Sequence, residues 1–137
     1  MKKYLILISL AFISLFSYGQ FGKGAMFPVA AGDTITNTGT ANKIITCTAG
    51  YDAMGIQPVI TKGTGTIGGN CIVYGSIDGT NYVSTGDTLK CTDITTNTKL
   101  FKYATTPYVY YKVVYTGTGT MVARWKVWYT LRKTITN

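Results

Sequence analysis

Residues 108–131, YVYYKVVYTGTGTMVARWKVWYTL, decide the fold, because apolar and polar side chains alternate along both halves of this stretch. In a β-strand successive side chains point to opposite faces, so every second residue shares a face. In the second half one face is cationic and aromatic, and the other is apolar and consists of Met121, Ala123, Trp125, Val127, Tyr129 and Leu131. The pattern predicts an antiparallel hairpin, turning at residues 116–119, inside a sheet with one face in the core and one in solvent.

The chain from residue 33 onward continues this β pattern. Short runs rich in Val, Ile, Thr and Tyr are separated by Gly, Asn and Asp, as is typical of all-β domains. Seven to nine antiparallel strands indicate an all-β sandwich, either a jelly roll or an immunoglobulin-like fold, and a closed barrel also fits. Pro58 predicts an edge strand or a bulge, because proline has no N–H for a ladder. We expect strands at residues 34–37, 43–49, 56–62, 69–77, 81–84, 88–94, 100–103, 108–115 and 120–132.

The first nineteen residues have the layout of a secretory signal. Lys2 and Lys3 precede an apolar run at residues 4–16, and small residues follow before Gln20. The run is short for a membrane span of about 20 residues, so we predict a signal peptide at residues 1–19, as a hydrophobic leader helix, with a retained membrane anchor as the alternative. Residues 20–32 predict an extended arm or linker, and residues 33–137 predict the β-sandwich domain.

The residues that most enzymes use for proton transfer are scarce in this chain. His and Glu are absent, and the five acidic residues are all Asp in sequence contexts typical of turns and strand ends. General acid–base catalysis needs a titratable group placed by the fold, and no Gly-rich motif precedes a predicted helix. We therefore predict that the protein is not an enzyme and that it binds no cofactor.

Three cysteines, Cys47, Cys71 and Cys91, each lie in a predicted strand. An odd number leaves at least one thiol free or paired between chains. Without His and without a CxxC pair a zinc site is not expected. An exported protein permits one disulfide, with Cys47–Cys71 and Cys71–Cys91 as the candidates, and the sequence does not choose between them.

Aromatic and cationic side chains lie opposite the apolar faces of the last two predicted strands. The chain has eleven Tyr, more than a core of this size needs, and Tyr and Trp are enriched where a ring meets a partner. Cross-strand pairing on a solvent face or a subunit interface accounts for these rings, and a glycan or nucleic-acid platform is the alternative. The candidate interaction face comprises Tyr108, Tyr110, Lys112, Arg124, Lys126, Trp128 and Arg132.

Two motifs resemble those of the small all-β virion structural proteins of tailed bacteriophages. One is the turn Gly-Ser-Ile-Asp-Gly-Thr-Asn-Tyr at residues 75–82, and the other is Tyr-Tyr-Lys-x-x-Tyr-Thr-Gly-x-Gly-Thr-Met at residues 110–121. The resemblance extends over residues 33–131 and implies a non-enzymatic particle protein, such as a capsid decoration, a head or tail fitting, or a fibre component. The alternative is a secreted bacterial β-sandwich that binds carbohydrate or a cell surface.

These readings imply particular partners. The first partner is a second copy of the chain, as symmetric self-association is usual for such proteins, or another particle protein. The net charge of +8 also favours acidic glycans and anionic surfaces, and more weakly nucleic acid. A membrane is a partner only if the leader is retained. The expected location is exported or extracellular, or the virion.

Overall fold

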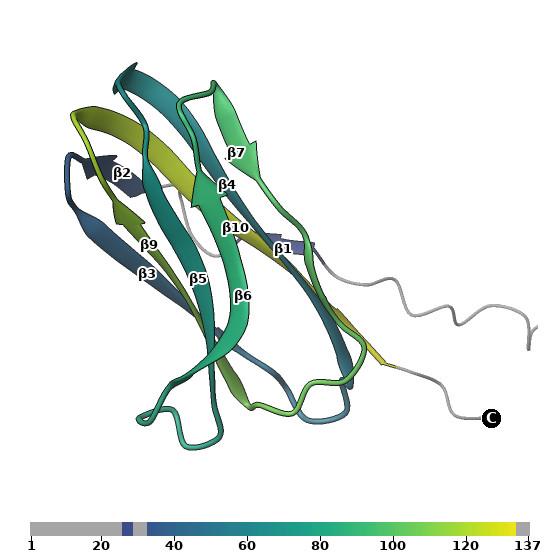
Figure 1. The fold of residues 1–137 in the computed structure, drawn as a ribbon. Coiled ribbons are helices and arrows are strands. Elements are labelled where there is room, and N and C mark those ends of the chain that lie inside the picture. Colours follow the sequence, from purple (N-terminus) through teal and green to yellow (C-terminus); the bar gives the residue numbers. More distant parts are fainter. Residues whose placement is uncertain (1–25, 29–32, 134–137) are drawn as a thin grey trace, which may run out of the picture.

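A computed structural model describes residues 26–28 and 33–133, which form two antiparallel sheets packed face to face (Figure 1). The leader helix predicted for residues 1–19 lies outside the described residues, as does most of the predicted arm. In the part of the chain that the structure describes, no helix is long and apolar enough to cross a membrane.

The six-stranded sheet has β10 (Met121–Arg132) and β4 (Ala53–Gly65) at its centre, paired over the whole of β10. The outer edge of β10 pairs with two short strands, β1 (Met26–Pro28) and β2 (Asp33–Thr36). The outer edge of β4 likewise pairs with β7 (Thr96–Thr98) and β8 (Phe101–Tyr103). Both edges of this sheet are therefore built from interrupted strands, which leaves little continuous edge for unwanted pairing.

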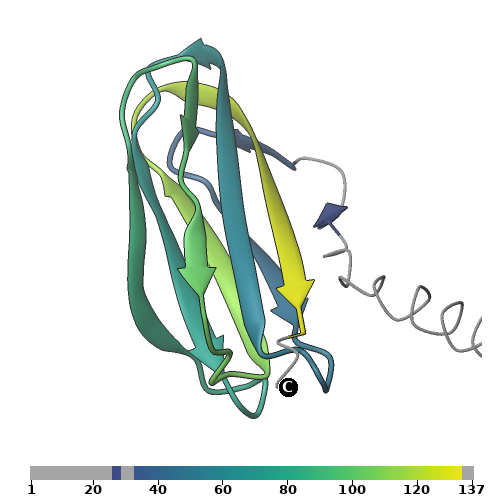
Figure 2. The same cartoon turned by 90° about the vertical axis from the view of Figure 1, so that its right-hand side faces the viewer.

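The four-stranded sheet has the order β3-β9-β5-β6. Its strands are β3 (Thr40–Thr46), β9 (Tyr110–Gly117), β5 (Gly69–Ser76) and β6 (Val83–Cys91). Seen from the side, the two sheets form the two layers of an elongated sandwich (Figure 2). Strands that follow one another in the sequence mostly lie in opposite layers. Among β2–β10 there are two exceptions. β5 and β6 are hydrogen-bonded neighbours in the four-stranded sheet, and the short strands β7 and β8 both pair with β4.

The hairpin predicted at residues 108–131 is wrong in one respect. Both strands form, but β9 lies in the four-stranded sheet and β10 in the six-stranded sheet, so the turn between them crosses the sandwich. Their apolar faces meet across the core instead of sharing one face of a sheet. The rings of Tyr115 and Trp125 are 6.3 Å apart between centroids, and the Tyr115 hydroxyl lies 3.4 Å from Sδ of Met121. Alternation fixes which side chains face inward, and it does not specify which layer a strand joins.

Pro58 lies in the central strand β4, so the prediction of an edge strand is wrong. β4 does carry a register shift, but it lies at Gly63, opposite Val122 and Ala123 of β10, and not at Pro58. On one side Pro58 is opposite Val127 of β10. On the other side β8 pairs with residues 54–56 and β7 with residues 59–61, so the ladder is interrupted at residues 57 and 58. Proline has no N–H to donate, and Pro58 lies in the gap where neither β7 nor β8 pairs with β4.

Other strand limits also differ from the expected ones. Residues 81–84 and 88–94 belong largely to the single strand β6, whose pairing with β5 is irregular between Ile72 and Tyr74. The short strands β1 and β7 were not expected, because three-residue strands have no readable period. Residues 26–28 of the predicted arm pair with β10 at Thr130, Tyr129 and Trp128.

One continuous core fills the space between the sheets. Trp125, Tyr111 and Tyr115 are its largest side chains, and each is fully buried. Burying a large apolar side chain stabilises a fold by about 1.5–3 kcal/mol, so these rings and the Ile and Val residues around them dominate the stability. Tyr115 donates a 2.9 Å hydrogen bond to the carbonyl of Gly68, which satisfies its buried hydroxyl. At one open side, an ion pair of 2.8 Å between Lys43 of β3 and Asp33 of β2 links the two sheets.

Candidate functional site

The structure divides the predicted interaction face between the two sides of the sandwich. Arg124, Lys126, Trp128 and Arg132 lie on the outer face of the six-stranded sheet, whereas Tyr110 and Lys112 lie on the outer face of the four-stranded sheet. The two groups are separated by the core, so they do not form one surface. Each outer face is described below by its own chemistry.

Tyr108 does not lie on either outer face. Its ring contacts Gly75 on the inward side of β5, so closely that a Cβ built on Gly75 would clash with the ring. The ring also makes an edge contact with Tyr111, at 5.7 Å between centroids. Val109 is 40% exposed instead. The strict alternation assumed for residues 108–115 holds only from Tyr110, where β9 begins.

The outer face of the six-stranded sheet carries a row of cations. Arg124, Lys126 and Arg132 are exposed along β10, and their cross-strand neighbours on β4 are the uncharged residues Thr61, Val59 and Ala53. The ion pairs found among the described residues join Lys43 to Asp33 and Lys62 to Asp93, so these three cations have no carboxylate partner there. Unneutralised charges on one face attract anions.

Trp128 belongs to this face but is only half-buried and not fully exposed. It stands opposite Gln57 on β4 and opposite Pro28 on β1 in the strand register. The arm strand β1 thus pairs with β10 where Trp128 lies. A stacking role for this ring stays a prediction.

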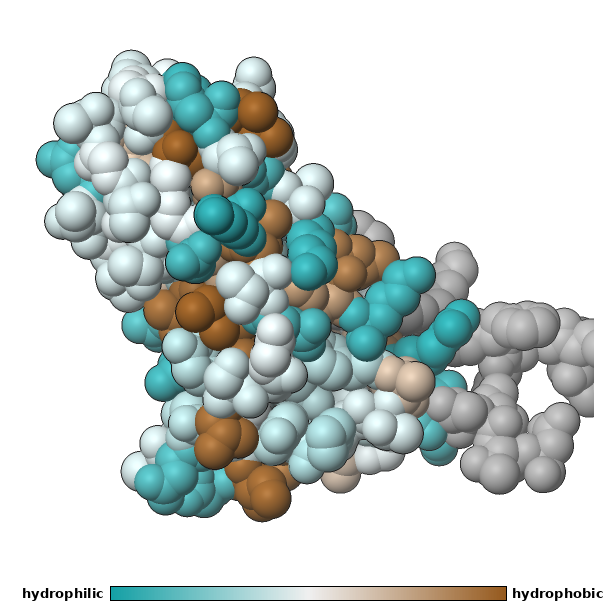
Figure 3. Space-filling view, in the orientation of Figure 1, coloured by the Kyte–Doolittle hydropathy of each residue, from teal (hydrophilic) through white to brown (hydrophobic). Residues whose placement is uncertain are grey.

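The outer face of the four-stranded sheet is aromatic and aliphatic around one cation. The ammonium of Lys112 lies 3.9 Å from the ring centroid of Tyr82 and 5.8 Å from that of Tyr74. Cation–π contacts of this kind contribute about 0.5–2 kcal/mol. Ile44, next to Lys112 in the register, is 49% exposed. Figure 3 shows exposed hydrophobic groups in brown also at the lower end of the molecule, near the β5–β6 turn, where Ile77 and Val83 are 72% and 55% exposed.

The β5–β6 turn is held by one carboxylate. Asp78 accepts hydrogen bonds from the amides of Thr80 and Asn81, from the Asn81 side chain, and from the Ser76 hydroxyl. These bonds hold the pKa of Asp78 far below its usual range, with the backbone bond from Asn81 as the largest cause. The turn within residues 75–82 is therefore held together by its own hydrogen bonds, which gives this carboxylate a structural role.

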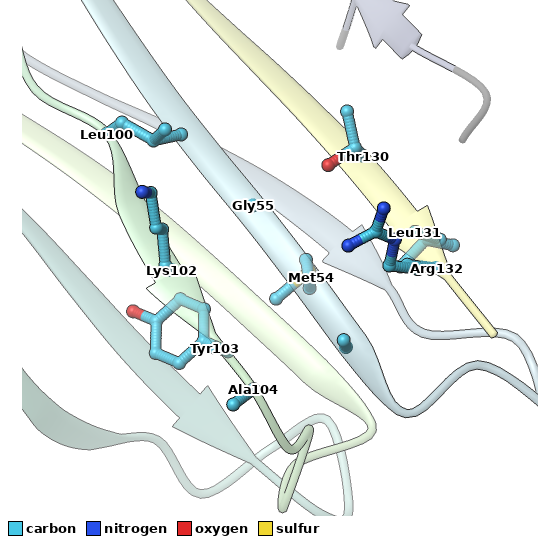
Figure 4. Close-up of a pocket in the computed structure, with 10 residues that line it drawn as sticks. Met54, Gly55, Leu100, Lys102, Tyr103, Ala104, Thr130, Leu131 and Arg132 are labelled. Carbon is cyan, nitrogen blue, oxygen red and sulfur yellow. The ribbon is translucent and has the colours of Figure 1, made fainter. Parts of the chain in front are cut away.

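A pocket of about 550 Å³ opens over Gly55 on the outer face of the six-stranded sheet (Figure 4). Leu100 and Lys102 line one side, from β8 and the residue before it, and Thr130 and Arg132 of β10 line the other. Gly55 of β4 lies between these walls and adds no side chain. The volume lies within the range of small-molecule sites, about 300–1,000 Å³.

The three cysteines are free thiols. Cys47 follows β3 and pairs its amide with Val109, whereas Cys71 is opposite Tyr115, six residues further along β9. Cys47 and Cys71 are therefore about 20 Å apart along that strand, too far for a disulfide. Cys71 and Cys91 are diagonal neighbours, because Cys71 is opposite Leu89 and Cys91 is opposite Gly69. Diagonal Cβ atoms stand further apart than the 3.5–4.5 Å that a disulfide prefers.

Burial makes these thiols poor nucleophiles. It raises the pKa of Cys71 to about 12, with a smaller contribution from Cys91, and it raises the pKa of Cys91 to about 11. The thiolate is the reactive form, so neither residue is an activated nucleophile. No group of three His, Cys, Asp or Glu residues that could hold a metal ion occurs within residues 26–28 and 33–133.

Asp87 and Tyr103 form a half-buried acid–phenol pair whose geometry is similar to that of catalytic pairs. The Tyr103 hydroxyl donates a 2.7 Å hydrogen bond to Asp87. Burial, chiefly, raises the pKa of Tyr103, which keeps the phenol protonated. The Thr85 hydroxyl joins the pair, at 3.3 Å from the Asp87 carboxylate and 3.5 Å from the Tyr103 hydroxyl, so these side chains link β8 to β6.

Comparison with known proteins finds solved structures of similar fold but no matching sequence family. No family model and no curated protein sequence matches the chain. Among solved structures, the chain is similar to the PBSX exported protein XepA, with a TM-score of 0.62 and 7% identity over 83% of this chain and 39% of that one. It is also similar to the Yersinia pseudotuberculosis-derived mitogen, with a TM-score of 0.51 and 8% identity over 83% and 92% of the two chains. The chain thus spans well under half the length of the first of these proteins.

A third similar structure is that of Bacillus endospore appendages, described as disulfide-linked pili, with a TM-score of 0.48 and 10% identity over 83% of this chain and 93% of that one. At such low identities the likeness concerns the fold alone.

Sequence reasoning missed the residues that shape both outer faces. Lys102 and Thr130 become neighbours only because β8 and β10 flank β4, and such long-range pairing leaves no local pattern. Tyr74 and Tyr82 were assigned to a strand and a turn, and their approach to Lys112 depends on the register of β5 with β9. Gly55 gave no signal either, because the expected strand began at residue 56, whereas β4 begins at Ala53 and contains it.

Proposed function

We propose that this chain is a non-enzymatic structural or binding module of a phage-like particle, such as a capsid decoration, a head or tail fitting, or a fibre component. We also infer that its sandwich is a jelly roll. With β1 and β2 merged as one interrupted edge strand and β7 and β8 as another, the sheets have the orders 1-8-3-6 and 2-7-4-5. Jelly rolls occur in capsid and lectin domains, although a fold by itself does not fix a function.

The observation that carries the proposal is the outer face of the four-stranded sheet. Val114 of β9 is opposite Ile72 of β5, and Ile44 of β3 is opposite Lys112 and diagonal to Val114. They lie next to the Tyr74–Lys112–Tyr82 cluster. The cation at the centre of this face is covered by two rings. Aromatic and aliphatic side chains with little charge are the composition of a protein–protein interface core.

Light scattering of the purified protein over a range of concentrations tests the proposal. We expect an oligomer, or a monomer that binds the particle, and we expect Ile44→Asp to abolish the association. Val122→Asp is the matched control, because Val122 is 37% exposed on the other sheet. A monomer at every concentration that has no affinity for any particle or cell surface contradicts the proposal.

The second candidate is a secreted carbohydrate- or surface-binding module. Arg124, Lys126 and Arg132, a row of cations that form no ion pair with the residues that the structure describes, favour it, as does the fold that the chain shares with a protein described as exported. Binding to a glycan array that is lost in Trp128→Ala favours a ring-stacking site. Affinity that falls steeply with salt and survives that substitution indicates attraction by charge alone.

A further inference from the structure

We propose that the pocket over Gly55 binds the carboxylate or sulfate group of an acidic saccharide. The site lies on the opposite sheet from the face assigned above to assembly, so this inference stands apart from the particle role. It gives the six-stranded sheet a defined ligand in place of a general attraction for anions. The shared chemistry is an oxyanion attached to a sugar ring.

The shape of the pocket comes from missing side chains. Gly55 and Ala53 form the floor on β4, between the walls provided by β8 and β10. A Cβ added to Gly55 would meet Oγ1 of Thr130 at 3.0 Å and Cδ1 of Leu100 at 3.6 Å. A side chain at residue 55 would fill the space between the two walls, so its absence leaves the floor open. Figure 4 shows Leu100, Lys102, Thr130 and Arg132 standing on either side of Gly55.

Two cations, one on each wall, give the pocket a positive charge. Lys102 of β8 and Arg132 of β10 are both exposed, and neither forms an ion pair among the described residues. No Asp lines the pocket, although Asp52 precedes Ala53 in the chain. An arginine guanidinium binds a carboxylate or sulfate with two parallel hydrogen bonds, and a lysine adds a second charge. Two cations across a space of this size define an oxyanion site.

The remaining lining fits a sugar better than a nucleobase. The Thr130 hydroxyl lies over the floor and offers a hydrogen bond to a ring hydroxyl. Leu100 is 51% exposed and gives an aliphatic wall for the C–H face of a ring. Bases bind on exposed aromatic platforms, and the only ring in the lining, Tyr103, is half-buried with its hydroxyl held by Asp87.

Isothermal titration calorimetry on the full chain at fixed ionic strength tests the inference. The probes are oligogalacturonate for a carboxylate, dextran sulfate for a sulfate, neutral dextran, and a single-stranded oligonucleotide. We expect binding to one of the acidic saccharides and none to neutral dextran. Gly55→Val, which fills the floor without changing charge, and the double variant Lys102→Gln/Arg132→Gln are each expected to weaken binding by about tenfold or more.

Lys90→Gln is the control, because it removes one positive charge from an exposed position of β6, on the other sheet and outside the pocket lining. It is expected to leave the affinity within about twofold, as for a screened surface charge. Circular dichroism melting confirms that each variant is folded, and Gly55→Ala serves if Gly55→Val is not. An equal loss of affinity per charge removed in Lys90→Gln and in the double variant, tighter binding of the oligonucleotide, or no binding of either acidic saccharide would each overturn the inference.

Discussion

Raising the pH from about 8 to about 11 is expected to unfold the domain. Four buried groups are held protonated, chiefly because burial disfavours their charged forms. The pKa of Cys71 is raised from 9.0 to about 12 and that of Cys91 from 9.0 to about 11. The pKa values of Tyr111 and Tyr115 are each raised from 10.0 to about 12. All four side chains are at most 5% exposed.

A group whose pKa is higher in the folded state than in the unfolded state stabilises the fold. This contribution is fully present below the pKa of the unfolded state, and it is lost as the pH rises toward the pKa of the folded state. At about pH 11 the loss is about 2–3 kcal/mol for each thiol and about 1.4 kcal/mol for each phenol, at 1.36 kcal/mol per pKa unit. The total of about 8 kcal/mol matches the whole stability of a typical domain, about 5–15 kcal/mol. The pH range over which stability is lost therefore begins near pH 9, where the thiols of the unfolded chain ionise.

Urea unfolding followed by tryptophan fluorescence at several pH values measures this loss, because buried Trp125 reports on the core. The urea midpoint should stay level up to about pH 8.5 and then fall steeply. In Cys71→Ala the drop between about pH 8 and about pH 11 should shrink by about a third, because Cys71 has the largest pKa shift of the four groups and contributes the largest share of the total of about 8 kcal/mol. An unchanged midpoint at about pH 10.5 would refute the burial of these groups.

Three further predictions concern single features. Thiol labelling of the unfolded protein should find three reactive cysteines. In the native protein at most one cysteine, the half-buried Cys47, should react promptly. A disulfide in the purified protein would contradict the structure. Gly75→Ala should lower the free energy of unfolding by about 1–3 kcal/mol, because the new methyl group displaces the Tyr108 ring, and calorimetry checks this. Asp78→Ala should speed amide exchange at residues 80 and 81 while leaving the core protected, because the turn loses its acceptor; unchanged exchange there would count against the role of this carboxylate.

The sequence predicted the inward faces of the long strands well. Met121, Ala123, Trp125, Val127 and Leu131 are all buried, as the alternation in the quoted stretch requires. Period-2 patterning is a local property, and burial on one face of a sheet enforces it. The all-β class and the sandwich follow from the same signal, and two packed antiparallel sheets confirm them.

The layer that each strand joins, and the residues that share one outer face, were harder to predict from the sequence. The turn at residues 116–119 looks like a hairpin turn, yet it crosses the sandwich, because the partner of β10 is β4 and not β9. For the same reason Lys112 and Arg124 share a pattern in the sequence and face opposite ways in space. Their roles as interaction residues stay predictions. The Tyr108 error arose because the parity of β9 was extended two residues beyond its start at Tyr110.

The position of β10 has a consequence for how the molecule is made. This strand, the last of those described, joins β4 on one side and β1 and β2 on the other, so every strand of the larger sheet depends on it directly or through β4. A nascent chain that lacks residues 121–132 therefore has no layer to close over the Tyr111 and Tyr115 rings. Residues up to 132 must therefore be synthesised before a stable structure exists, and until then the chain can be threaded, cleaved or captured by a chaperone.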